Sequence, residues 1–458
     1  MSGIFGVYSM GDENVAAELL MGTVSLQHKG EEGCGISFPK ANGFYTPKAK
    51  QLAYYFFRDK FNGLKELKEK NPKVAIGHTL YENTGGLQPV EQWGESHMLS
   101  LAMDGVLLGF GGKNDSVVRT LFSRYLDETH NYYTAIELLM KKLKGHGSYC
   151  VVALVKRGEE VDLVTFRDPK GIKPLCFGEK KSENGIKYII SSETKGLDAV
   201  EAKFVRYVEP GEVVVITKDG LNSKKLVDEK HAHCFFDWIY FADPTSVIEG
   251  KNVYEVRKEL GRRLARRHFD RVGDIDLVMA SPDSGRGVAI GFQQELCKLT
   301  GKFIPYEEAS VKNSGAKRTF QIENEEERKL AANVKFFMNG SVVKGKNVAV
   351  GDDSIVRGTV FRDGMIYKLR KAGAKKIYPI ISCPALLYAC IKDPKGKNFA
   401  AFGLNGNAEE VGEMVAKKTD ADFVCYPTTE DVIETLGFDD ICKACIDGQF
   451  PIDEKFWK

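Results

Sequence analysis

One stretch near the C-terminus constrains the fold most strongly, because it joins a buried strand, two carboxylates and a turn of small residues. Residues 348–350 are a short apolar run typical of a buried strand. Asp352 and Asp353 follow it, and the turn at 354–359 leads into a helical pattern that stops at Gly373. The N–H groups of such a turn can bind a phosphate while the carboxylates bind a diol. The alternative is a strand–helix turn whose polar residues only cap the helix.

The same stretch resembles the PRPP (phosphoribosyl diphosphate) loop of type I phosphoribosyltransferases. More narrowly, it resembles that of the iron–sulfur type of glutamine amidophosphoribosyltransferases, which act first in purine synthesis. The resemblance extends over nearly the whole chain. It implies that PRPP is bound by the eight residues of the loop: Asp352, Asp353, Ser354, Ile355, Val356, Arg357, Gly358 and Thr359.

Two other segments complete the expected PRPP site. The turn Asp283-Ser284-Gly285 resembles the family loop that meets pyrophosphate, and Mg²⁺ would be held through Ser284, Asp352 and Asp353. Residues 312–320 resemble the flexible loop that closes over PRPP and excludes water. In the family match Arg318 and Lys335 are catalytic, whereas Gly315 stands where the family has Tyr.

Composition limits the class of protein. The chain has 458 residues, 43% of them apolar, and so can bury large cores in two or three domains. Its 65 basic and 63 acidic residues leave a net charge of +2, which favours neither nucleic acid nor a membrane surface as a partner. The sequence contains no apolar run of membrane-spanning length, and we expect a cytoplasmic protein.

The order of predicted elements defines two domains. Strand and helix patterns alternate after residue 252, which predicts a mostly parallel sheet with ligands at the carboxyl ends of its strands. The resemblance implies an α/β protein, with an N-terminal four-layer α/β/β/α Ntn-hydrolase sandwich and a C-terminal type I phosphoribosyltransferase domain. A polar segment at 219–230 is the expected boundary, giving domains at 2–225 and 231–458.

The N-terminal half resembles a class II glutaminase whose active-site residues are altered. After removal of Met1 the first residue would be Ser2, where the family has a nucleophilic Cys. Leu80 replaces the Arg that grips the glutamine carboxylate, and Asp104, beside Gly105, replaces the Asn of the oxyanion hole. Asp115, at the position that holds the substrate amine, is retained. We therefore expect a structural domain without glutaminase activity.

Four of the ten cysteines match positions that ligate iron in the family. Cys442 and Cys445 form a CxxC pair, Cys234 lies in the linker match, and Cys390 follows the segment at 382–384, with Cys383 as the alternative to Cys390. The resemblance implies a 4Fe–4S cluster; zinc has the same possible ligand set, and buried free thiols are the plainest alternative.

Three functions compete. The first is a PRPP-dependent transferase that makes 5-phosphoribosylamine from ammonia rather than glutamine. The second is a paralogue that uses another amine or other nucleophile, and the third is a non-enzymatic PRPP or nucleotide sensor. The retained lid argues against the sensor. The family resemblance further implies purine nucleotides as feedback inhibitors and a homodimer or homotetramer.

Overall fold

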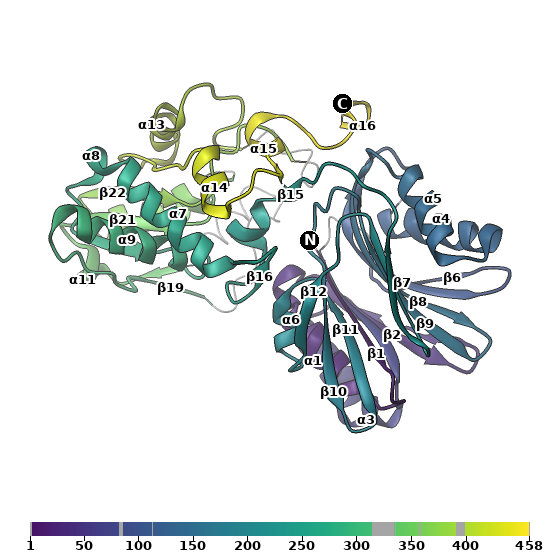
Figure 1. Cartoon of the computed structure of the whole chain (residues 1–458). Helices are drawn as coiled ribbons and strands as arrows, with labels where there is room; N and C mark the ends of the chain where they lie inside the picture. Colours follow the sequence, from purple (N-terminus) through teal and green to yellow (C-terminus); the bar gives the residue numbers. More distant parts are fainter. Residues whose placement is uncertain are drawn as a thin grey trace.

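The N-terminal half consists of two stacked antiparallel sheets covered by helices on both outer faces (Figure 1). The computed structural model describes residues 2–81, 86–111, 113–313, 334, 336–356, 358, 360–390 and 399–457. The first sheet contains, in spatial order, β12 (Lys203–Tyr207), β10 (Cys176–Ser182), β11 (Gly185–Ser191), β1 (Gly3–Ser9), β5 (Val74–Leu80), β2 (Gly33–Lys40) and β3 (Gly43–Tyr45), with β4 (Lys48–Ala49) paired to β2. The second contains β14 (Gly220–Lys225), β13 (Glu212–Thr217), β9 (Glu160–Arg167), β8 (Gly147–Arg157), β7 (Met98–Leu107) and β6 (Val90–Trp93).

The layers follow from the alternation of side chains along the central strands. In β1, Ile4 and Tyr8 enter the core between the two sheets, whereas Phe5 and Val7 face the outer helices. The helices on the first sheet are α1 (Ala16–Ser25), α2 (Ala53–Phe61), α3 (Lys65–Glu69) and α6 (Thr194–Asp198), with the short η1 (Gln27–Lys29). Those on the second sheet are α4 (Asn114–Thr129) and α5 (Tyr132–Lys142). The expected four-layer sandwich is confirmed.

The C-terminal half is built on a parallel sheet of β18 (Leu277–Ala280), β21 (Asn347–Asp352) and β22 (Lys376–Ile381). Parallel bridges extend it to Tyr306 beside β18 and Cys425 beside β22. Its long helices are α7 (Val253–Arg267), α9 (Arg286–Thr300), α13 (Ala408–Thr419) and α14 (Thr429–Leu436). The shorter elements are β16 (Val247–Ile248), β17 (Lys251–Asn252), α8 (Phe269–Val272), β19 (Ser310–Lys312), β20 (Phe336–Met338), α11 (Gly340–Val343), η5 (Val360–Ile366) and α12 (Tyr367–Lys371). The parallel-sheet domain is confirmed.

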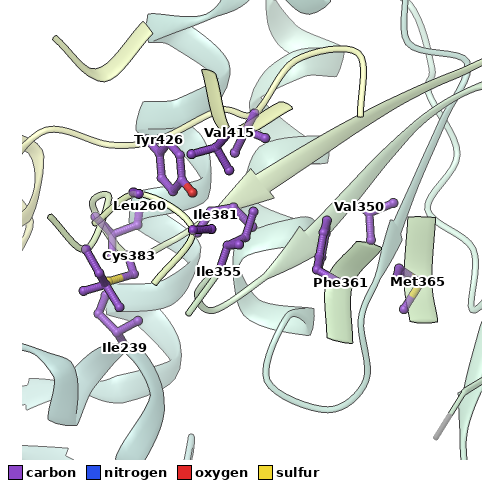
Figure 2. Packing of buried hydrophobic residues seen from close by; sticks show 14 of the residues in the cluster. Ile239, Leu260, Val350, Ile355, Phe361, Met365, Ile381, Cys383, Val415 and Tyr426 are labelled. Carbon is purple, nitrogen blue, oxygen red and sulfur yellow. The ribbon is translucent and has the colours of Figure 1, made fainter. Parts of the chain in front are cut away.

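Apolar side chains from strands and helices fill two cores in this half, and Figure 2 shows residues of the one that contains Leu260 and Val350. Leu260 of α7 and Val350 of β21 are fully buried in it, as the helical and strand patterns require. The expected strand at 423–426 is reduced to the bridge at Cys425. Pro427 follows and has no N–H to offer a ladder, and Thr428 then caps α14.

The two halves meet along the linker and the end of the chain. After β14 the chain forms the short strand β15 (His233–Cys234), which pairs in parallel with β23 (Ile441–Cys442), and the π-helix η3 (Asp237–Phe241). The chain then ends in α15 (Ala444–Asp447) and α16 (Glu454–Trp457), and α16 lies against the N-terminal half (Figure 1). There the ring of Phe456 stacks on His146, with ring centroids 3.6 Å apart. Among the described helices, none is long and apolar enough to cross a membrane.

Candidate functional site

The carboxyl ends of β18 and β21 bring two predicted segments together. The N–H of Ser281 donates to Gly351 O over 2.8 Å, so the chain leaves both strands side by side. Ser284 then donates through Oγ to Asp353 Oδ1 at 2.6 Å. A Cβ at Gly285 would lie 2.0 Å from Gly351 O, so only glycine permits this approach. The predicted pyrophosphate turn and the predicted ribose carboxylates therefore form one cluster.

The two adjacent carboxylates lie at different depths. Asp353 is buried, and its two oxygens accept hydrogen bonds from the hydroxyls of Ser284 and Ser354, the latter at 2.7 Å. Asp352 is half-buried, and its Oδ1 accepts the N–H of Asp353 at 2.9 Å. The buried carboxylate is thus fixed in position, while its neighbour reaches toward the surface.

The turn after these carboxylates is held to the domain by its main chain. Ile355 is buried in the core near Ile381 (Figure 2), and Val356 O accepts the N–H of Ala400 at 2.7 Å. Gly358 has a φ of +75°, a left-handed conformation that favours glycine. Helix η5 begins two residues later. Four predicted site residues lie outside the described residues: Arg318, Lys335, Arg357 and Thr359.

Asp283 marks the solvent side of this cluster. Its carboxylate accepts a hydrogen bond from Arg286 Nη1 at 2.7 Å and lies 3.5 Å from Lys312 Nζ. Lys312 ends β19, where the expected lid segment begins. Basic groups therefore stand beside the turn that we expect to meet pyrophosphate.

In the N-terminal half the predicted nucleophile and the predicted oxyanion position are in direct contact. Ser2 is fully buried, and its N–H donates to Asp104 Oδ1 at 3.0 Å. Its Oγ accepts the N–H of Tyr81 at 3.3 Å. Leu80, the last residue of β5, is also buried, so an aliphatic side chain stands next to this position.

The surroundings of Asp104 are polar groups packed into a closed interior. His78 is fully buried, and burial lowers the pKa of its imidazole to about 3, so the ring is neutral. Gly105 has no room for a side chain, because a Cβ would lie 2.1 Å from Ser148 O. Asp115, in the first turn of α4, is buried, and its Oδ1 has no hydrogen-bond partner among the described residues.

The predicted iron-ligand cysteines converge at the junction of the linker and the chain end. The β15–β23 ladder places Cys234 opposite Cys442. Cys445 O accepts the N–H groups of Leu387 and Tyr388, which brings the segment leading to Cys390 to the same place. Burial raises the pKa of the Cys445 thiol well above its usual value, and the nearby thiols of Cys390, Cys383, Cys442 and Cys234 raise it further.

Two clusters of side chains were not predicted from the sequence. One is a buried cluster around Glu193, which accepts hydrogen bonds from Lys29 and from Ser246; the sequence showed only that these residues lie in or next to segments that resemble family motifs. The other brings His231, His233 and Asp440 together. The His-x-His spacing places both imidazoles on one face of an extended segment. This spacing is visible in the sequence, but it does not indicate Asp440 as the third residue.

Comparisons with known proteins give a consistent result, although no family model matches the chain. The chain is 34% identical to the amidophosphoribosyltransferase of Methanocaldococcus jannaschii, over 100% of this chain and 99% of the relative. It is 33% identical to that of Methanothermobacter thermautotrophicus, over 98% and 94% of the two chains.

Two solved structures share the fold over almost the whole length. One is the glutamine PRPP amidotransferase of B. subtilis complexed with ADP and GMP, with a TM-score of 0.82, 29% identity and coverage of 98% of this chain and 97% of the other. The other is the allosteric regulatory enzyme of purine biosynthesis, with a TM-score of 0.83, 28% identity and coverage of 98% and 96%.

Proposed function

Because the chain belongs to the amidophosphoribosyltransferase family, a family of phosphoribosyl-transferring enzymes of purine biosynthesis, we propose that it makes 5-phosphoribosylamine from PRPP and ammonia rather than glutamine. The observation that carries this proposal is the contact between Ser2 and Asp104. With Met1 removed, the Ser2 nitrogen would be an α-amine 3.0 Å from a carboxylate. A carboxylate at that distance favours the protonated amine, which cannot act as a base.

The PRPP site would work through positioning. Asp352 and Asp353 would bind the ribose hydroxyls, the backbone of residues 354–359 the 5′-phosphate, and Ser284 and Gly285 the pyrophosphate. The nitrogen lone pair of ammonia forms the bond to C1 of the ribose, and the C1–O bond to pyrophosphate breaks with inversion. Arg318 and Lys335 remain predicted as catalytic residues.

Magnesium fits the donors of this cluster. Ser284, Asp352 and Asp353 offer hydroxyl and carboxylate oxygens, the hard ligands that Mg²⁺ prefers, and two of these oxygens lie 2.6 Å apart. Mg²⁺ would neutralise the charge that develops on pyrophosphate. The chain's own contribution is to hold Asp353 between two serine hydroxyls so that its oxygens stay in place.

We propose a 4Fe–4S cluster rather than zinc at the four converging thiols. Tetrahedral zinc with bonds of about 2.3 Å requires sulfur atoms about 3.8 Å apart. Among the described residues, the set of ligand atoms within 4.8 Å of one another contains no cysteine. Cys383 is fully buried beside Ile239 and Leu260 (Figure 2), as a core residue would be, which favours Cys390 as the fourth ligand.

The remaining parts of the proposal rest on the relatives. The ADP and GMP complex of the B. subtilis enzyme supports purine nucleotides as feedback inhibitors of this chain. We also propose a homodimer or homotetramer in the cytoplasm, and functional domains at 2–225 and 231–458. The end of β14 at Lys225 and the start of β15 at His233 support that boundary.

The decisive experiment measures pyrophosphate and glutamate separately. With PRPP and Mg²⁺, we expect ammonium to support pyrophosphate release and glutamine to give neither pyrophosphate nor glutamate. Loss of one oxyanion donor alone costs about 100- to 1,000-fold, and Leu80 cannot form the bidentate contact that an Arg makes with a carboxylate. Glutamate production at a rate comparable to PRPP turnover would show that the N-terminal site works.

Restoring the family's residues at the altered positions is the matched control for the predicted lack of glutaminase activity. Ser2→Cys alone should produce no glutaminase activity, because the Asp104 carboxylate would still favour the protonated α-amine, which cannot act as a base. The triple variant Ser2→Cys, Leu80→Arg and Asp104→Asn should produce glutamate. If ammonium does not support pyrophosphate release but other amines do, the protein is the paralogue that uses a different nucleophile. If PRPP binds but no amine is turned over, the protein is a PRPP sensor.

Removing a thiol tests the proposed cluster. Prepared without oxygen, the protein should be brown and contain about four iron and four sulfide per chain. Cys442→Ser and Cys390→Ser should lose the colour and lower the thermal stability of the C-terminal half, because ligation there joins the linker to the chain end. Cys383→Ser and the control Cys297→Ser, a thiol on α9, should keep the iron. A colourless preparation without iron would refute the cluster, and zinc that is lost in Cys442→Ser would show that the thiols bind zinc instead.

A further inference from the structure

A second group of metal-binding side chains lies beside the cysteines but is not part of them. The ligand atoms of His231, His233 and Asp440 all lie within 4.8 Å of one another. The Nδ1 of His231 is 3.4 Å from Asp440 Oδ2, and the Nε2 of His233 is 3.8 Å from the same oxygen. Tetrahedral ligands at about 2.1 Å from an ion are about 3.4 Å apart, so the three atoms need to move only slightly to share one ion.

The backbone explains why these side chains meet. The N–H of His233 donates to Asp440 O at 2.9 Å, where β15 begins to pair with β23. Successive residues of a strand face opposite sides, so the side chains of His233 and Cys234 leave β15 on opposite sides, while His231 and Asp440 lie just before the two strands. The group of His231, His233 and Asp440 and the group of four thiols therefore meet at the same short ladder but share no residue.

The hydrogen bonds of His233 orient it as a ligand. Its Nδ1 is 2.8 Å from Gly171 O. A carbonyl oxygen only accepts, so Nδ1 carries the proton and Nε2 presents its lone pair toward Asp440. Arg167 Nη2 lies 3.3 Å from the same Nδ1 and donates to Gly171 O at 2.9 Å. Metal-ligating histidines characteristically donate their second N–H to a carbonyl in this way.

We propose that His231 Nδ1, His233 Nε2 and Asp440 Oδ2 bind one divalent first-row transition-metal ion, with Zn²⁺ as the reference ion. Imidazole and carboxylate ligands suit Zn²⁺ and its neighbours and are poor ligands for the softest, thiolate-preferring ions. Three protein ligands leave a fourth position for water, and the half-buried side chains of His231 and Asp440 leave the site open to solvent on one side. The ion would tie the linker to the last strand independently of the proposed chemistry at the PRPP site.

Titration with Zn²⁺ and Co²⁺ under anaerobic conditions tests this site on the full-length, cluster-loaded protein. We expect one Zn²⁺ per chain by calorimetry and a higher thermal midpoint in its presence. Bound Co²⁺ should show d–d bands without the charge-transfer band of a cobalt–thiolate bond. His231→Ala and Asp440→Asn should each weaken Zn²⁺ binding at least tenfold and remove the thermal shift.

His130→Asn is the matched control. His130 is exposed at the end of α4 with a φ of 52°, a conformation that asparagine tolerates well. This variant should bind Zn²⁺ as the unmodified protein does. Equal Zn²⁺ affinity in His231→Ala, Asp440→Asn and the unmodified protein would overturn the proposal, as would a cobalt spectrum dominated by thiolate charge transfer. Because His231 is partly exposed, its variant keeps the test decisive even if Asp440→Asn unfolds.

Discussion

The double variant Asp352→Asn and Asp353→Asn is expected to lose PRPP-dependent pyrophosphate release by about a thousandfold or more. A hydrogen bond to a charged group contributes about 1.5–3 kcal/mol, and two such bonds to the ribose would be lost together, a total of about 4 kcal/mol. The fold should survive. Asparagine keeps one acceptor at each position, and the hydroxyls of Ser284 and Ser354 can turn to accept from the new amide.

Asp276→Asn provides the control, because it changes a carboxylate at the opposite end of the same sheet. Asp276 Oδ2 accepts the N–H of Asn347 at 2.8 Å, at the amino end of β21. This variant should retain full turnover. Protection of the protein by PRPP against thermal unfolding should be present in the control and absent in the double variant. Full activity in the double variant would refute the assignment of the PRPP site.

The second large effect is expected from Glu193→Gln, which removes the charge at the centre of a buried cluster joining the two halves. Glu193 Oε1 lies 2.7 Å from Lys29 Nζ and 3.1 Å from His28 Nε2. Its Oε2 accepts the N–H of Asp243 at 3.0 Å and the hydroxyl of Ser246 at 2.8 Å. The side chains of Lys29 and Glu193 are both fully buried.

The substitution should lower the free energy of unfolding by about 3–5 kcal/mol, because the buried Lys29 ammonium loses the carboxylate to which it is hydrogen-bonded. The shift of the denaturant midpoint measures this loss. Glu137→Gln, which breaks the exposed pair with Lys141 on α5, should cost less than about 0.5 kcal/mol. Lys29→Met added to Glu193→Gln should recover part of the loss. A loss for Glu193→Gln no larger than that for Glu137→Gln would show that the buried pair contributes little.

The same pair predicts a dependence on pH. Burial alone would raise the pKa of Glu193, but Lys29 and His28 outweigh burial and hold it well below its usual value. The pKa of this carboxyl is lower in the folded protein than in the unfolded chain, where it is about 4.3. Its ionisation therefore stabilises the fold fully above about pH 4.3, and this stabilisation is lost as the pH falls toward the folded-state pKa. The difference in stability between the unmodified protein and Glu193→Gln should therefore shrink below about pH 4.

Much of the fold could be predicted because the spacing of apolar residues along the chain indicates its helices and strands. The spacing of Val253, Val256, Leu260 and Leu264 required one buried helical face, and all four are buried in α7. The strand before Asp352 was predicted from three β-branched and small residues and is the central strand of the sheet. The expected strand at 423–426 was wrong in extent, because a composition typical of a strand cannot show that Pro427 ends the pairing after one bridge.

The site was predictable only where its residues lie close in sequence. The motif around Asp352 and the turn at Ser284 could each be recognised alone, but the 2.6 Å contact between Ser284 and Asp353 needed the sheet. The contact of Ser2 with Asp104 joins two distant segments, and neither residue's neighbours indicate it. Pairing across the domain junction is set by tertiary packing, about which local periodicity says nothing.

The short ladder of β15 and β23 has a consequence for how this protein is made. It pairs two segments about two hundred residues apart, and the second lies near the end of the chain. During synthesis the N-terminal sandwich can fold as soon as its last strand emerges, whereas Cys234 must wait for Cys442 and Cys445. The junction between the linker and β23 can therefore form only after about two hundred further residues have been synthesised. If the proposed cluster and metal ion bind at this junction, a shortage of metal would leave the N-terminal half folded and the junction unassembled.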